Sequence, residues 1–180
     1  MKRIYLIRHC KASGQEASAE LTQEGVTQAG QLADFLEDKF IDWIVCSPYQ
    51  RAISTIQPLA QRLGLPIHRD DRLRERILSS EGMPDWMDKL RKSFDDLDMK
   101  LPGGESSREA MTRGISVMED LVQRPEINLV VVTHGNLMSL ILKHYDSSFG
   151  YEAWSRLTNP DVYELGVTGD KVMDVKRLWK

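Results

Sequence analysis

The chain contains 180 residues, of which 41% are hydrophobic, and it carries a formal net charge of −3. This length supports one domain with a sizeable core and is short for two, so we expect residues 1–180 to fold as a single domain. The net negative charge argues against a general surface for nucleic acid or for anionic membranes. Affinity for an anion must therefore come from a local cluster of residues.

The first part of the chain alternates between apolar runs and a helical pattern. Residues 3–9 predict a buried strand, and residues 41–46 form a second continuous apolar run. Between them, residues 22–38 carry apolar or small side chains three or four positions apart, as one face of a helix requires. That face consists of Val26, Ala29, Leu32, Ala33 and Leu36. We therefore expect a strand, a helix and a strand in this order.

The segment 47–64 predicts a second helix. Ser47 is suited to the N-cap and Pro48 to the first helical position, and Gly64 marks the end. Because proline lacks a backbone donor and clashes with the preceding turn, we expect Pro58 to kink or split this helix.

The same alternation returns later in the chain. A capping box from Ser106 to Glu109 predicts the start of another helix. The apolar run 129–133 then predicts a strand, and residues 136–145 predict a helix after it. The apolar face of the helix that begins near Ser106 comprises Met111, Ile115, Met118 and Val122.

The C-terminal residues 162–167 and 171–179 predict two strands joined by the tight turn 168–170. Strands that alternate with helices predict an α/β fold with a three-layer, mostly parallel mixed sheet, flanked by helices on both faces. The C-terminal hairpin is expected to be antiparallel and to lie at one edge. The segment 76–104 breaks the alternation with dense charge, and we interpret it as an insertion.

Neither the start of the chain nor its cysteines indicate a secreted or metal-bound protein. The apolar run Ile4–Ile7 is far shorter than a signal or membrane-spanning segment, so we expect a cytoplasmic protein without a membrane partner. Cys10 and Cys46 lie near the ends of two predicted strands without the spacing of a zinc site. We expect free thiols, no metal and no cofactor.

Polar side chains follow three of the predicted strands, at the point where each strand ends. The first strand ends in Arg8 and His9, the second leads into Ser47 and Arg51, and the third ends in residues 133–136, Thr-His-Gly-Asn. Ligands of open α/β sheets bind beyond the carboxyl ends of the strands. We therefore expect these residues to meet in one site.

Two arginines and two histidines in one cluster require an anionic partner, because like charges about 4–6 Å apart oppose one another. The planar fork of arginine suits phosphate, with which it makes two parallel charge-assisted bonds. Arg51 also lies near the start of a predicted helix, whose amides favour an anion. The cluster therefore predicts a pocket for a phosphoryl group and a small phosphorylated substrate.

The residues also limit which nucleophile such a pocket holds. Cys46 lies one residue too close to Arg51 for the loop of a cysteine phosphatase, and no nucleotide-binding P-loop is present. The paired carboxylates at 70–71 and 95–96 lie in polar stretches and are most simply solvated. Histidine is then the remaining nucleophile.

The chain resembles the histidine phosphatase superfamily, also called the phosphoglycerate mutase-like family. The matching positions extend in the family's order from Leu6 to about Leu142. They comprise Arg8-His9, Leu21-Thr22, Gly25, Gln28-Ala29, Ser47-Pro48, Arg51-Ala52, Thr55, Leu73, Glu75 and His134-Gly135. The resemblance implies a mixed sheet covered by helices, which agrees with the fold class expected from the strand and helix patterns.

The resemblance also implies roles for individual residues. His9 would attack phosphorus to form a phosphohistidine, while Arg8, Arg51 and His134 hold the peripheral oxygens. Glu75 would protonate the leaving oxygen and then activate water. Fixed positive groups stabilise the charge that develops in such a transfer, and a carboxyl that gives and then takes a proton assists both halves of the reaction.

Some positions leave alternatives open. Glu81 competes with Glu75 as the general acid, and Glu75 has the alternative of a surface ion pair with Arg72 or Arg74. Gln15 and Asn136 are expected to contact the substrate. The candidate site therefore comprises seven residues: Arg8, His9, Gln15, Arg51, Glu75, His134 and Asn136.

The chain departs from the family at two positions. Cys10 stands where the family usually has glycine, and Gln15 stands where it often has asparagine. A side chain at position 10 narrows the space near the phosphate or changes the approach of the backbone. Neither departure removes a charged candidate residue.

Hydrolysis is the expected reaction, because mutases of this family carry further segments that enclose the substrate. The insertion at about 76–104 would lie over the active site and choose the substrate, with Met83, Trp86, Met87 and Phe94 as its apolar residues. The alternatives are a phosphoglycerate mutase-type phosphotransferase and a catalytically weak, phosphate-binding regulatory module.

Overall fold

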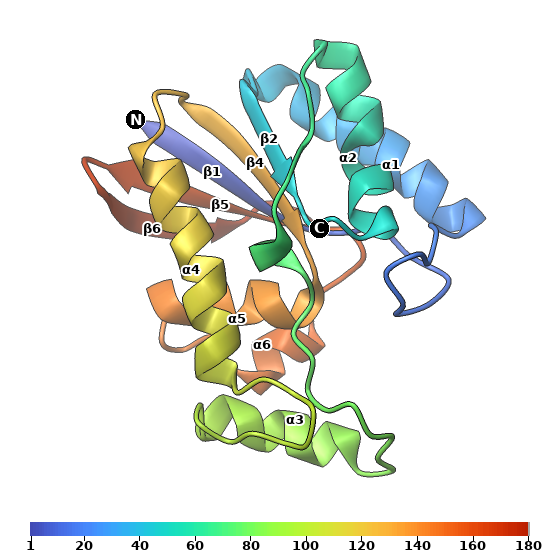
Figure 1. The fold of residues 1–180 in the computed structure, drawn as a ribbon. Coiled ribbons are helices and arrows are strands. Elements are labelled where there is room, and N and C mark those ends of the chain that lie inside the picture. Colours follow the sequence, from blue (N-terminus) through green and yellow to red (C-terminus); the bar gives the residue numbers. More distant parts are fainter. Residues whose placement is uncertain (180) are drawn as a thin grey trace.

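Six strands form one mixed sheet at the centre of the computed structural model, which describes residues 1–179 (Figure 1). The strands are β1 (Lys2–Arg8), β2 (Trp43–Cys46), β3 (His68–Arg69), β4 (Asn128–Thr133), β5 (Asp161–Thr168) and β6 (Lys171–Arg177). Their order across the sheet is β3-β2-β4-β1-β5-β6. The strands from β3 to β1 pair in parallel, whereas β5 and β6 are antiparallel. The predicted fold class, including its antiparallel C-terminal hairpin, is confirmed.

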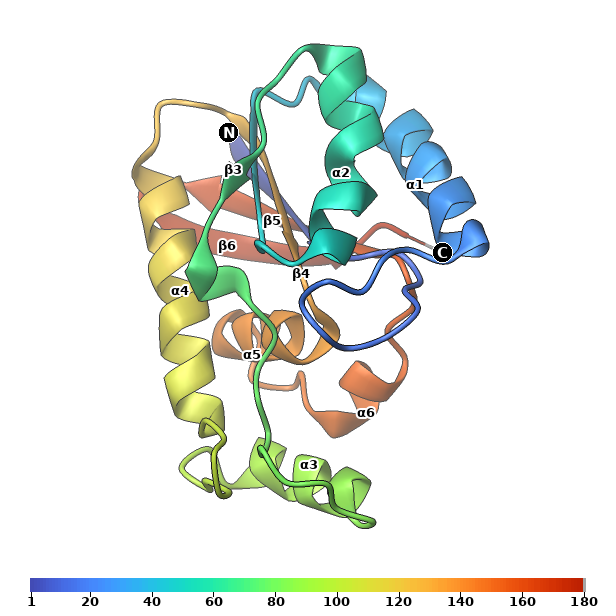
Figure 2. The same cartoon turned by 45° about the vertical axis from the view of Figure 1, so that its right-hand side comes forward.

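The helices cover both faces of this sheet (Figures 1 and 2). They are α1 (Gln23–Leu36), α2 (Gln50–Leu63), α3 (Trp86–Asp95), α4 (Ser107–Gln123), α5 (Gly135–Tyr145) and α6 (Tyr151–Ser155), with short 3₁₀ turns η1 (Glu37–Lys39) and η2 (Asp71–Leu73). One face carries α1 and α2, and the other carries α4 and α5. No helix within residues 1–179 is both long and apolar enough to cross a membrane.

The position of β1 inside the sheet explains why its residues form a continuous apolar run. Successive side chains of a strand point to opposite faces of the sheet. Tyr5 and Ile7 therefore join the core under α1 and α2, while Ile4 and Leu6 join the core under α4 and α5. All four are buried. Covering both faces buries the four central side chains of the strand and leaves charged residues at its two ends.

The start of α2 differs from the prediction. The helix begins at Gln50 with Tyr49 at the N-cap position, whereas we expected Ser47 there. The Ser47 hydroxyl accepts the Tyr49 amide at 3.2 Å, but its Oγ also lies 2.8 Å from the His134 ring. The Ser47 hydroxyl thus contacts the turn before the helix and the His134 ring, and the helix begins after this turn. Pro58 lies inside α2 without splitting it, and Gly64 ends the helix in a left-handed conformation as its position indicated.

The buried face of α1 starts one residue earlier than the apolar pattern indicated. Val26 is 56% exposed, while Gly25 is buried. A Cβ at Gly25 would lie 2.1 Å from the Lys11 carbonyl oxygen, so the helix packs there through its backbone. The remaining face, Ala29, Leu32, Ala33 and Leu36, is buried as predicted.

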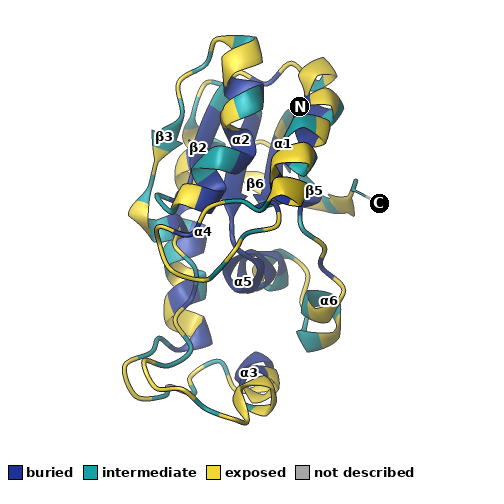
Figure 3. Cartoon of the chain, turned by 90° about the vertical axis from the view of Figure 1, so that its right-hand side faces the viewer, coloured by how far each residue is buried: buried dark blue, intermediate teal, exposed yellow. Residues whose placement is uncertain are grey.

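The segment 76–104 contains α3, which lies beyond the end of the sheet next to α6 (Figures 1 and 2). The Phe94 ring of α3 lies 6.4 Å from the Tyr151 ring of α6. Figure 3 shows that α5 is buried almost throughout, whereas α3 presents a largely exposed outer side. Phe94 therefore belongs to the packing of α3 against the rest of the molecule.

The N-cap of α4 provides a test of the local structure. The Ser106 hydroxyl accepts the Glu109 amide at 3.0 Å, as the capping box predicted. Because Ser106→Ala leaves this amide without its acceptor, it should lower the free energy of unfolding by about 1 kcal/mol in chemical denaturation. Thr112→Ala, an exposed hydroxyl in the same helix, is the matched control and should change it by less than about 0.5 kcal/mol. Equal changes in the free energy of unfolding for the two variants would show that the N-cap hydrogen bond does not stabilise the protein.

Candidate active site

The carboxyl ends of β2, β4 and β1 lie side by side, because these strands are neighbours in the sheet and parallel. Arg8 pairs with Thr133 in the register of β1 and β4, so the two strands end at the same level. His9 and His134 follow these strands directly, and their ring centroids are 5.1 Å apart. The structure therefore brings the strand ends together, as expected from the sequence.

The side chain of His9 is held as a neutral ring. Its Nδ1 lies 2.7 Å from the Cys10 carbonyl oxygen, and because a carbonyl only accepts, Nδ1 carries the hydrogen. The lone pair is then on Nε2, which accepts from Nε of Arg51 at 3.3 Å. Burial lowers the pKa of His9 to about 4, and the charges of Arg51 and Arg8 act in the same direction. An unprotonated Nε2 is what a nucleophilic histidine requires.

Arg51 lies in the first turn of α2 and is almost fully buried. Besides its contact with His9, it donates from Nη1 to the Glu16 carbonyl at 2.7 Å. Figure 2 shows this loop after β1, in dark blue, near the ends of the strands. Burial lowers the pKa of Arg51, which makes no ion pair with a carboxylate within residues 1–179. The positive charge of its guanidinium is thus available to an anion.

Arg8 ends β1 and reaches the site beside Gly135. Its Nη1 donates to the Leu157 carbonyl at 3.2 Å, while its buried Nε has no hydrogen-bond partner within residues 1–179. A Cβ at Gly135 would lie 2.8 Å from this Nε. Glycine at position 135 therefore leaves room for the Arg8 guanidinium. Burial also lowers the pKa of Arg8.

His134 is fully buried between β4 and α5. Its Nε2 lies 2.8 Å from Oγ of Ser47, and its Nδ1 has no hydrogen-bond partner in the described part of the chain. Burial holds the pKa of His134 well below its usual range, and the nearby His9 and Arg51 add to the effect. His134 is therefore a neutral ring at physiological pH.

Glu75 lies at the N-terminus of α5. Its carboxylate accepts the backbone amides of Asn136 at 3.0 Å and Leu137 at 2.9 Å, and also the amide of Arg76 at 2.7 Å. The positive end of a helix dipole favours a carboxylate at this place. The structure thus orients Glu75 toward the same strand ends as the histidines.

Among the described residues, Glu75 forms neither of the surface ion pairs, with Arg72 or with Arg74, that were its alternative role. Arg72 forms ion pairs with Asp70 and Asp120 instead of Glu75. Arg74 donates to the Asp71 carbonyl, and no ion pair between it and Glu75 occurs among the described residues. Glu81, the other candidate acid, is exposed.

A cavity of about 460 Å³ opens at these residues. It is lined by Arg8, Gln15, Glu75, Arg76, Leu78, Trp86, Leu90, Asn136 and Trp154. Four of the predicted residues, Gln15 and Asn136 among them, thus line the cavity directly. The other three form the buried cluster of His9, Arg51 and His134 that adjoins it through Arg8 and Asn136.

Several residues of the site were not predicted from the sequence. Asn159 donates from Nδ2 to the His9 carbonyl at 3.0 Å, although the two are far apart in the chain. Oγ1 of Thr55 accepts the Cys10 amide at 2.8 Å and donates to the Arg51 carbonyl at 2.7 Å. Thr55 belongs to the matched motif, whereas nothing in the sequence indicates Asn159. Both fix the backbone around the candidate nucleophile.

Neither Cys10 nor Cys46 is suited to act as a nucleophile, because both are buried free thiols. Burial raises the pKa of Cys10 to about 12 and that of Cys46 to about 12. Within residues 1–179, no group of three His, Cys, Asp or Glu side chains is arranged to hold a metal ion.

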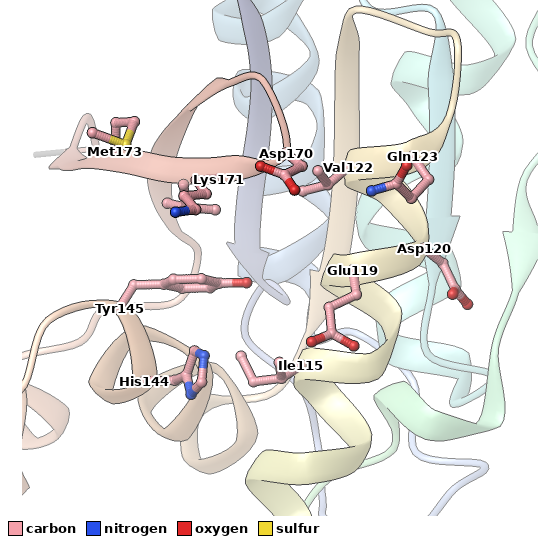
Figure 4. Close-up of a pocket in the computed structure, with 11 residues that line it drawn as sticks. Ile115, Glu119, Asp120, Val122, Gln123, His144, Tyr145, Asp170, Lys171 and Met173 are labelled. Carbon is pink, nitrogen blue, oxygen red and sulfur yellow. The ribbon is translucent and has the colours of Figure 1, made fainter.

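A separate cleft lies between α4, the end of α5 and the β5–β6 turn (Figure 4). In it, the Tyr145 ring extends toward Glu119. Burial raises the pKa of Tyr145 to about 12, and Glu119 contributes to this shift. None of the seven candidate site residues lines this cleft, which is therefore distinct from the cavity at the strand ends.

Comparison with known proteins supports the resemblance seen in the sequence. The chain is 29% identical to the putative phosphoserine phosphatase 2 of Hydrogenobacter thermophilus, over 95% of this chain and 92% of the relative. A mycobacterial glucosyl-3-phosphoglycerate phosphatase is similar in structure, with a TM-score of 0.77, 25% identity and coverage of 98% and 96% of the two chains. The fold is also that of Bacillus stearothermophilus YhfR, with a TM-score of 0.82, 22% identity and coverage of 96% and 95%.

The family model named histidine phosphatase superfamily (branch 1) matches residues 4–178. This range includes both histidines at the strand ends and the arginines and carboxylate beside them. The chain belongs to the histidine phosphatase superfamily.

Proposed function

We propose that this protein is a phosphomonoester hydrolase that works through a phosphohistidine on His9. The observation that carries the proposal is the neutral His9 ring, whose Nε2 is unprotonated and lies 3.3 Å from Nε of Arg51. A nucleophilic nitrogen beside a buried cation is suited to attack an anionic phosphate, because the cation draws the anion to the nitrogen.

In the first step, the Nε2 lone pair forms a bond to phosphorus while the ester P–O bond breaks. Arg8, Arg51 and His134 contact the peripheral oxygens. Glu75 enters this step in its protonated form, gives its proton to the leaving alcohol oxygen and becomes a carboxylate. Arg8 and Arg51 lie where negative charge develops in an in-line transfer, and neither has a carboxylate ion-pair partner among the described residues.

In the second step, water attacks the phosphohistidine. Glu75 takes a proton from this water as the new O–P bond forms and the P–N bond breaks, which releases phosphate and restores His9. The position of Glu75 on the cavity wall supports this role over one for the exposed Glu81. Gln15 and Asn136 line the same cavity and are proposed to bind the substrate.

We also propose that residues 1–180 act as one domain and that the segment 76–104 covers the site. This arrangement is supported by Arg76, Leu78, Trp86 and Leu90, which line the cavity together with Arg8. Transfer to water, rather than back to the substrate, agrees with the phosphatase names of the relatives described above.

Trapping the intermediate tests the proposed function. After brief reaction with a labelled phosphomonoester and an alkaline quench, the label should be on His9, because phosphohistidine survives base. His9→Ala should trap no label and lose turnover. His144→Ala, which removes an exposed histidine on α5 away from the cavity, is the matched control and should behave like the wild type. Label on another residue, or unchanged hydrolysis by His9→Ala, would contradict the mechanism.

The lowered pKa of His9 leads to a pH prediction for the phosphate-free protein. The unfolded histidine takes up a proton below about pH 6.5 and the folded one only below about pH 4, so the contribution of His9 to stability is lost as the pH falls through this window. In an NMR titration, the His9 ring signals should therefore stay constant from pH 7 to about 5. Titration near pH 6.5 would show that the ring is not held in its buried, neutral form.

The two candidate acids are separated by their response to the leaving group. Glu75→Gln should slow hydrolysis of ethyl phosphate on the order of 100-fold more than hydrolysis of p-nitrophenyl phosphate, because only the poor leaving group needs a proton. Glu81→Gln is the matched control and should leave kcat/KM for both substrates unchanged. The assignment is wrong if the selective loss appears in Glu81→Gln.

A further inference from the structure

The part of the cavity next to Arg8 and Glu75 has mostly apolar walls. Trp86 and Leu90 come from α3, Leu78 from the segment before it, and Trp154 from α6 on the other side. Trp86 is 47% exposed, so an indole lies at the surface of the cavity without being covered by protein. A single exposed apolar side chain is common, but apolar side chains that gather on the wall of one cavity indicate a ligand-binding site.

The position of Trp154 is fixed by an aromatic chain between α3 and α6. The Tyr151 ring lies 6.4 Å from the Phe94 ring and 5.4 Å from the Trp154 ring. The Arg91 guanidinium lies over the Tyr151 ring at 4.6 Å. These contacts join α3 and α6, the two helices that carry the tryptophans. The positions of both helices are therefore fixed without a bound ligand, and the cavity is preorganised.

Arg76 adds a cation to the same cavity. It is 4% exposed, and its guanidinium donates to the Glu105 carbonyl at 3.0 and 3.2 Å and to Oγ of Ser93 at 3.1 Å. All of these acceptors are uncharged, and Arg76 has no carboxylate ion-pair partner among the described residues. A guanidinium attracts the negative face of an aromatic ring as well as an anion.

Building on the proposed function, we propose that these residues form a leaving-group subsite for phosphomonoesters whose alcohol carries a flat, apolar ring. The subsite comprises Arg76, Leu78, Trp86, Leu90 and Trp154. It is continuous with the phosphate site, because Arg8 and Glu75 line the same cavity. A volume of about 460 Å³ is in the range of pockets that enclose a ring-bearing ligand, and exceeds what a phosphate alone fills.

The apolar walls favour a ring over a small, charged alcohol. Leu78, Trp86 and Trp154 are not buried and present apolar surface that a ring can cover, whereas a compact polar alcohol leaves the two indoles in contact with water. A carboxylate on the alcohol would interact with Arg76 alone. We therefore place the ring, and not a second anionic group, as the feature that is recognised.

A pair of substrates with alcohols of similar leaving ability tests the subsite. Ethyl phosphate and 2-(2-naphthyl)ethyl phosphate differ in the ring but not in the type of ester, so the ratio of their kcat/KM values measures recognition of the ring. The wild-type enzyme should prefer the naphthyl ester by about 10-fold or more, from burial of the ring face. Trp86→Ala and Trp154→Ala should each reduce this ratio at least about 3-fold.

Met87→Ala is the matched control. Met87 is the neighbour of Trp86 on α3 and is 48% exposed, nearly as much as Trp86, but it does not line the cavity. The variant should keep the wild-type ratio and activity. A fall in the ratio for Met87→Ala equal to that for Trp86→Ala would attribute the effect to α3 as a whole and overturn the subsite.

The remaining outcomes separate the subsite from the proposed function. Equal kcat/KM for the two esters, or a ratio that both tryptophan variants leave unchanged, overturns the subsite while the hydrolase activity stands. A higher kcat/KM for phosphoserine than for the naphthyl ester, lost in Arg76→Gln, also overturns it in favour of carboxylate recognition. Absence of turnover with every ester, p-nitrophenyl phosphate included, overturns the proposed function and the subsite with it.

Discussion

The parallel alignment of β2, β4 and β1 is the constraint on which the candidate site depends. Each strand is apolar to its end because helices cover both faces of the sheet, so polar residues first appear where the strands stop. The register places Arg8 opposite Thr133, and the histidines that follow come within 5.1 Å of each other. Three segments far apart in the chain thereby supply one cluster. A shift of one strand relative to the others would separate its members.

Within this cluster, burial determines the charge of each group. Removing the two histidine rings from water favours their neutral forms, and the neighbouring guanidiniums act in the same direction. Arginine keeps its charge under the same conditions because its ordinary pKa is so high. The result is a neutral histidine ring beside fixed positive charge, as the proposed nucleophile requires. The dipole of α5 completes this arrangement by holding the Glu75 carboxylate through the Asn136 and Leu137 amides.

The phosphate end and the outer end of the cavity are built differently. Residues at the strand ends are held by hydrogen bonds to the backbone, such as those of Arg51 to Glu16 and of Arg8 to Leu157. The outer walls are held by aromatic packing between α3 and α6. Changes in these two helices can therefore alter the wall that faces the leaving group without altering the strand ends.

The sequence predicted five of the six strands, most helices and the family, because apolar periodicity, capping residues and short motifs are local properties of the chain. The two-residue strand β3 was not predicted, because it is too short to show a periodicity. It also indicated Arg8, His9, Arg51 and His134 as neighbours, since parallel strands end at a common edge. Three features appear only in the folded chain: Ser47 contacts His134, Asn159 donates to the His9 carbonyl, and Trp154 lines the same cavity as Trp86. These contacts join residues from distant parts of the chain, and only the packing of complete helices and loops determines which side chains meet.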